Sequence, residues 1–96
     1  MDQARLDQIL DLLKRHQQAA TYSAVAGVVG GSPRNVMKGQ HGSHRCSWVV
    51  SKQTHRPTGY APADIDPRLP TSVSARGVLE TPEDLRDWLE ALAVAD

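Results

Sequence analysis

The sequence predicts a small α+β domain that occupies the whole chain, residues 1–96. Three observations indicate this class: amphipathic helical stripes near both ends, two short helical segments around a Gly-Gly turn in residues 21–39, and an apolar, β-branched segment, "CSWVVS". A chain of 96 residues can bury one modest core. Because the chain contains no phenylalanine, aliphatic side chains and two tryptophans must fill that core.

The two ends of the chain each predict an amphipathic helix. The first begins after Asp2 as N-cap and runs to about Gln18. Its apolar stripe has the spacing i, i+3, i+4 and i+7 and consists of Leu6, Ile9, Leu10 and Leu13. The last helix begins after Thr81 as N-cap, with Pro82 at its first position. Its buried stripe consists of Leu85, Trp88, Leu89 and Leu92.

The segment that follows the first helix predicts a helix-turn-helix. Thr21 caps the helix "TYSAVAGVVG", which ends at its two glycines. Ser32 then caps a short helix that reaches Gly39, with Pro33 at its first position. The polar side chains expected on the outer face of this second helix are Arg34, Asn35 and Lys38. In a DNA-binding helix-turn-helix, the second helix enters a groove of the duplex.

The apolar segment predicts the first strand of a β-hairpin. A polar turn follows it, and "TGY" begins the returning strand at Tyr60. A hairpin after a helix-turn-helix is the wing of a winged-helix fold, and Lys52, His55 and Arg56 would lie at its tip. We expect the proline-rich residues 61–74 to form a long surface loop and "RGVLE" to form a short strand.

Charge is segregated along the chain although the formal net charge is zero. Residues 12–63 contain no Asp or Glu, but they carry seven Lys and Arg residues and all four histidines. Such segregation creates a local field that favours a phosphate-facing surface. The alternative is an ordinary solvated run of charges without a partner.

Several classes of protein are not expected. A single cysteine excludes an internal disulfide, and no apolar leader or spanning segment is visible, so we expect a cytoplasmic protein without a membrane partner. The spacing of His41, His44, Cys46 and His55 is not a standard zinc pattern. No glycine-rich phosphate loop follows a strand. The sequence therefore predicts neither a metal nor a cofactor.

Two stretches in the middle of the chain resemble one known family. "TYSAVAGVVGGSPRNV" is similar to the Thr-Tyr-Gly helix, turn and recognition helix of the alkylguanine-DNA alkyltransferases, and "RCSWVVSKQTHRPTGY" resembles their active-site strand. The family includes alkyltransferase-like proteins, which have lost the reactive cysteine. Motif order and approximate spacing agree over residues 21–60. The resemblance implies a winged-helix domain that binds DNA through the minor groove, flips a base and probes it in a pocket.

The resemblance also implies roles for individual residues. Tyr22 matches a tyrosine that lies beside the target phosphate, and Arg34 matches the arginine that fills the gap left by the flipped base. Cys46 occupies the position of the alkyl acceptor. The expected DNA-binding set is Tyr22, Arg34, Asn35, Lys38, Arg45, Lys52 and Arg56. The expected pocket set is Cys46, Trp48 and Tyr60, with core packing as the alternative for Trp48.

The departures from the family pattern bear on catalysis. An acceptor cysteine must be deprotonated, and the family places a histidine directly after it, where this chain has Ser47. We therefore expect a non-enzymatic DNA-binding protein in which no residue is catalytic and Cys46 is an apolar-like strand residue. A second hypothesis is a protein-interaction or transcription-regulatory winged-helix module, including self-association through the acidic carboxy-terminal helix. A third is a divergent alkyl acceptor that uses Cys46.

Overall fold

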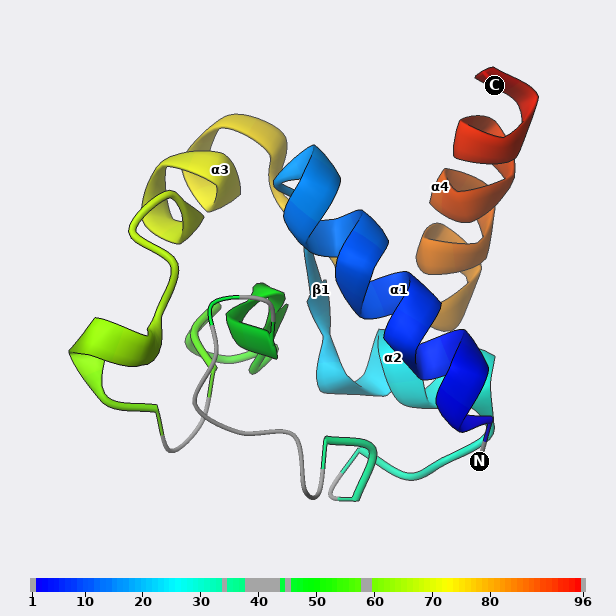
Figure 1. Ribbon diagram of the computed structural model, residues 1–96, viewed down its shortest axis with the longest axis horizontal. Coiled ribbons are helices and arrows are strands. Elements are labelled where there is room, and N and C mark those ends of the chain that lie inside the picture. Colours follow the sequence, from blue (N-terminus) through cyan, green and yellow to red (C-terminus); the bar gives the residue numbers. More distant parts are fainter. Residues whose placement is uncertain (1, 34, 38–43, 45, 58–59, 96) are drawn as a thin grey trace.

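The computed structural model describes residues 2–33, 35–37, 44, 46–57 and 60–95. Helices surround a short sheet, with α1 crossing in front of β1 and α4 standing to one side (Figure 1). In chain order the elements are α1 (Gln3–His16), β1 (Ala19–Thr21), α2 (Tyr22–Val29), the 3-10 helix η1 (Cys46–Trp48), β2 (Val49–Val50), the 3-10 helix η2 (Pro62–Asp64), α3 (Leu69–Arg76), β3 (Val78–Leu79) and α4 (Pro82–Ala95). The α+β class predicted from the sequence is confirmed.

Helix α1 forms as its sequence predicts. The Asp2 side chain accepts a hydrogen bond from the Arg5 backbone N–H at 3.0 Å and so satisfies one of the free donors of the first turn. The four residues of the apolar stripe are all buried: Leu6, Ile9, Leu10 and Leu13. The helix ends at Gln17, whose φ of 54° is left-handed and whose N–H returns to the last turn.

The sheet is parallel, and β1 is its central strand in the order β2-β1-β3. Ala20 is paired with Val49 on one side and with Leu79 on the other, while Thr21 is paired with Val50. All three residues of β1 are buried, as expected for a strand that is covered on both faces. Helix α2 begins at the residue directly after β1, so the strand fixes where that helix starts.

Helices α2 and α4 approach each other closely at a glycine. A Cβ atom added at Gly27 would lie 2.7 Å from the Pro82 Cβ and closer still to the Pro82 Cγ. No side chain fits in that space, so the contact requires glycine. The Arg86 guanidinium donates to the Gly27 carbonyl at 3.1 Å and holds the same two helices together.

The predicted hairpin differs from the structure. Cys46–Trp48 is a 3-10 helix, the strand contains only Val49–Val50, and this strand pairs in parallel with β1. The chain then closes a tight turn in which the His55 N–H donates to the Ser51 carbonyl at 2.8 Å. Tyr60 belongs to no strand, and residues 58–59 lie outside the described residues. A short apolar run is compatible with a fully buried parallel strand as well as with a hairpin, and here burial decided the pairing.

Two further segments differ from their predicted structure. Residues 61–74, predicted as a loop, contain η2 and most of α3, because Pro62 and Pro70 lie in the first turns of these helices, where proline is tolerated. In the predicted recognition helix, the described residues 33 and 35–37 form turns, with the Val36 N–H donating to the Ser32 carbonyl at 2.9 Å. Val36 and Met37 are buried, as expected.

A buried polar network joins η1 to the segment before α3. The Asp66 carboxylate accepts hydrogen bonds from the Trp48 indole N–H at 3.3 Å and from the Arg68 guanidinium at 2.9 and 3.1 Å. The Asp66 backbone N–H donates to the Ser47 hydroxyl at 3.0 Å. Because Asp66 is only 1 % exposed, these partners are what make its burial tolerable. Hydrogen bonds from Arg68 hold the pKa of Asp66 at about 2 despite the burial.

The Thr21 hydroxyl makes two hydrogen bonds whose contribution to the free energy of unfolding can be measured. It accepts from the Ala24 N–H at 3.1 Å and donates to the Glu80 carbonyl at 3.0 Å. Replacing Thr21 by Val keeps the shape but removes both bonds, and we expect a loss of about 2–3 kcal/mol in the free energy of unfolding. Thr21→Ser removes only a methyl group and should cost about 1 kcal/mol. Urea unfolding at neutral pH measures both; equal losses would contradict the role of the hydroxyl.

The Asp66 network predicts a component of acid sensitivity. The folded pKa of about 2 lies below the usual value near 3.9, so the ionised carboxylate stabilises the fold above about pH 4, and this is lost as the pH falls through 2. Between pH 5 and 2, the wild-type protein should lose about 2 kcal/mol more than Asp66→Asn, which has no carboxylate there to titrate. Urea unfolding at a series of pH values gives the comparison. Identical pH dependence in the two proteins would show that Asp66 is not held ionised.

Candidate nucleic-acid interface

A small hollow lies where β1 and β2 end and α2 begins. Its volume is about 270 Å³, and it is lined by Thr21, Tyr22, Ser23, Pro33, Ser51, Lys52 and Gln53. The parallel pairing of Thr21 with Val50 brings the two strand ends together, so the first turn of α2 faces the turn that follows β2. Two residues of the predicted DNA-binding set, Tyr22 and Lys52, therefore line one site although they are thirty positions apart.

The hollow has the electrostatics of an anion site. The amino-terminal end of α2 carries the positive end of the helix dipole, and no acidic residue lies in its first turn. The exposed Lys52 side chain adds a full positive charge at the opposite wall. Tyr22 is half-buried there and is the first residue of the helix. A phosphate oxygen is the kind of group that such an arrangement can bind.

Tyr60, Cys46 and Tyr22 form a neighbouring cluster. Burial, followed by the neighbouring Cys46 and Tyr22 side chains and a hydrogen bond with Cys46, raises the pKa of Tyr60 well above its usual value near 10. The phenol is therefore neutral over the physiological range. Cys46 is 5 % exposed, so the pair presents little of the thiol to solvent. The structure thus brings together two of the three residues predicted to form a pocket.

Trp48 lies in the core and not in this cluster. Its side chain is fully buried, and its indole N–H donates to Asp66. A ring without exposed surface has no face on which a base could stack. The packing alternative considered for Trp48 accounts for its position.

The residues around Cys46 are engaged in structural hydrogen bonds. The Ser47 hydroxyl donates to the His44 carbonyl at 2.7 Å and accepts from the Asp66 N–H. The His44 ring nitrogen Nε2 lies 3.1 Å from the Ala63 carbonyl. The Ser47 hydroxyl is bound to two main-chain groups. Ser47 therefore does not replace the histidine that activates the thiol in the family that this chain resembles.

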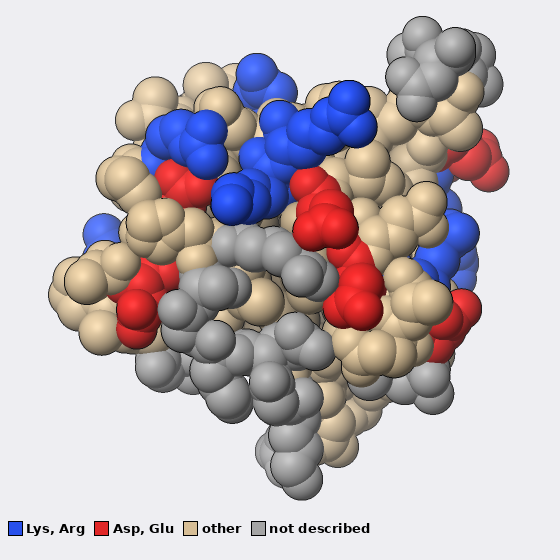
Figure 2. Space-filling model, viewed as in Figure 1, with Lys and Arg blue, Asp and Glu red and all other residues tan. Residues whose placement is uncertain are grey.

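The other predicted DNA-binding residues do not meet in this hollow. Asn35 is exposed, and its amide donates to the Ser32 hydroxyl at 3.1 Å. Arg56 lines a different hollow of about 460 Å³ with His55 and the apolar side chains of α3 and the segment before it. Arg34, Lys38 and Arg45 lie outside the described residues. Figure 2 shows Lys and Arg next to Asp and Glu on the face that carries α1, so charge does not mark that face as an anion site.

Two negative observations apply to the described part of the chain. It contains no group of three His, Cys, Asp or Glu side chains arranged to hold a metal ion, and His41 lies outside it. Within the same ranges, every helix is too short or too polar to cross a bilayer.

Five of the seven residues that line the hollow were not predicted as site residues: Thr21, Ser23, Pro33, Ser51 and Gln53. Their place depends on the parallel pairing of β1 with β2, for which the sequence has no local signal. Comparisons of the chain with models of protein families, with curated proteins and with solved structures found no match. Function must therefore be inferred from the hollow and the Cys46–Tyr60 pair themselves.

Proposed function

We propose that the chain is a non-enzymatic DNA-binding protein that resembles alkyltransferase-like proteins. The observation that carries this proposal is the hollow at the start of α2, where the helix end and Lys52 converge. The hollow belongs to the stretch of residues 12–63 that contains no acidic residue. No carboxylate within that stretch competes with a phosphate for this site, and the Glu80 carboxylate, from outside the stretch, lies 3.7 Å from His55 of the turn 51–57.

The proposed mode of binding places one backbone phosphate in the hollow. The start of α2 offers the positive end of the helix dipole, Tyr22 lines the hollow, and Lys52 offers an ammonium on a flexible stem. Such contacts position the protein on the duplex but carry no sequence information. The turn 51–57, which holds Lys52 and Arg56, takes the part of the wing in this proposal.

The cluster beside the hollow would examine the nucleotide whose phosphate is bound. Tyr60, which is half-buried, presents a neutral phenol there, and the buried Cys46 thiol holds it from behind by a hydrogen bond; a neutral phenol suits the edge of a neutral base. Turning a base out of the stack costs a few kcal/mol, and this cost is smallest for a damaged base. A site that binds the flipped base therefore favours lesions. Because Ser47 is bound to the main chain, we propose that the damaged base is recognised without transfer of its alkyl group.

An interaction module is the second candidate function. The observation that favours it is an apolar groove between α1 and α4, lined by half-buried leucines. This groove and the hollow share no lining residue, so the two functions do not exclude each other.

Lys52→Ala should weaken DNA binding severalfold and lower the salt slope, d log K/d log[salt], by about one, because one phosphate contact is lost. The matched control is Lys14→Ala, which removes another exposed lysine, in the last turn of α1 and outside the hollow. Fluorescence anisotropy with a short duplex at low and moderate salt measures both. Equal effects of the two lysine changes would contradict the phosphate site.

Arg34→Ala should also weaken DNA binding, and the loss should depend on the salt concentration. The same anisotropy measurement checks this change.

Recognition of a lesion predicts tighter binding to a duplex that contains one O-alkylated guanine than to the plain duplex. Tyr60→Phe removes the hydroxyl and keeps the ring, so it should reduce this preference and leave binding to the plain duplex unchanged. Mass spectrometry of the incubated protein should show an unmodified Cys46. A permanent alkyl adduct on Cys46 would instead establish the enzyme hypothesis, and equal affinity for both duplexes would indicate a general DNA-binding protein.

A further inference from the structure

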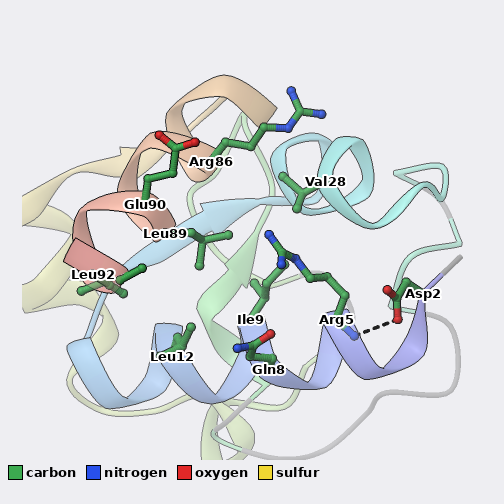
Figure 3. A pocket seen from close by; sticks show the side chains of 11 residues that line it. Asp2, Arg5, Gln8, Ile9, Leu12, Val28, Arg86, Leu89, Glu90 and Leu92 are labelled. Carbon is green, nitrogen blue, oxygen red and sulfur yellow. Dashed lines mark hydrogen bonds between the residues drawn. The ribbon is translucent and has the colours of Figure 1, made fainter. Parts of the chain in front are cut away.

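A groove with a volume of about 660 Å³ lies between α1 and α4 (Figure 3). Ile9 from α1 and Val28 from α2 lie at its base. The walls carry Leu12 on one helix and Leu89 and Leu92 on the other, all of them half-buried, and the exposed Ala93 continues the apolar surface. These leucines give the groove apolar surface that a partner could cover.

The groove carries charges of both signs. Arg5 extends from α1 into the groove, and Glu90 lies on α4 on the opposite wall (Figure 3). Within the described chain, neither of these two side chains has a hydrogen-bond or ion-pair partner. Of the other charged lining residues, Asp2 caps α1 and Arg86 donates to Gly27. One free cation and one free anion thus accompany the leucines of the groove.

We propose that this groove is the interface with a second copy of the chain, related by a two-fold axis. In such an interface every contact occurs twice, so the surface must complement itself. The groove has this property, because Glu90 of each copy can pair with Arg5 of the other while the leucines of the two α4 helices cover each other's grooves. The groove contains two acids and two bases, and the chain has zero formal net charge, so like-charge repulsion does not oppose the contact.

Sedimentation velocity over the micromolar to millimolar range tests the proposal. Wild-type protein should shift from monomer to dimer with concentration, and Ala93→Glu should weaken this association by about tenfold or more by placing a carboxylate in the groove. The matched control is Ala75→Glu, the same change at an exposed helical alanine of α3 outside the groove. Circular dichroism verifies that both variants fold. A wild-type protein that stays monomeric throughout, or equal effects of the two changes, overturns the proposal.

A charge exchange tests the pairing itself. Arg5→Glu and Glu90→Arg should each weaken self-association, because each homodimer would then bring like charges together. A one-to-one mixture of the two variants should restore the dimer, since both of its pairs again join opposite charges. Both changes are at exposed helix positions and leave the core intact. If mixing does not restore the dimer, the reciprocal Arg5–Glu90 contact is wrong.

Discussion

The hydroxyl group of Thr21 fixes the junction on which the rest of the structure depends. Thr21 is the last residue of the central strand, and it is paired with Val50 of the neighbouring strand. Its hydroxyl accepts a hydrogen bond from the first turn of α2 and donates one to the Glu80 carbonyl, just before α4. One buried group therefore sets where α2 starts, how β1 lies against the end of β3, and where α4 departs. The proposed phosphate site is the outer side of this junction, so its geometry follows from the same two bonds.

The second constraint is the carboxylate of Asp66. Buried charge is costly unless its partners satisfy it, and here an indole N–H and a guanidinium do so. The same residue's N–H binds the Ser47 hydroxyl, so the network also fixes the residue directly after Cys46. This has a functional consequence: the side chain that follows Cys46 contributes to folding and is not available for proton transfer. In the proposed function, the Cys46–Tyr60 pair would recognise a base without chemistry at the thiol.

The sequence predicted the helices better than the sheet, and the reason is physical. The caps at Asp2, Thr21 and Thr81 and the leucine stripes are local signals, and each of these helices formed at its expected start. Parallel pairing joins residues that are tens of positions apart, so the buried Val49–Val50 pair was indistinguishable from a hairpin strand. The prolines of residues 61–74 predict a loop, although Pro62 and Pro70 lie in the first turns of helices. Of the candidate site, Tyr22, Lys52, Cys46 and Tyr60 could be found by motif, whereas the groove requires knowledge of how α1 packs beside α4.

Backbone amide chemical shifts can show whether DNA contacts the protein at the start of α2. In a titration of isotope-labelled protein with a short duplex, we expect the largest shifts at Tyr22, Ser23 and Lys52. The amides of Leu89 and Leu92 in the α1–α4 groove should change little. Shifts concentrated on α4, or no shifts with any duplex, would contradict the account and leave the groove as the functional surface.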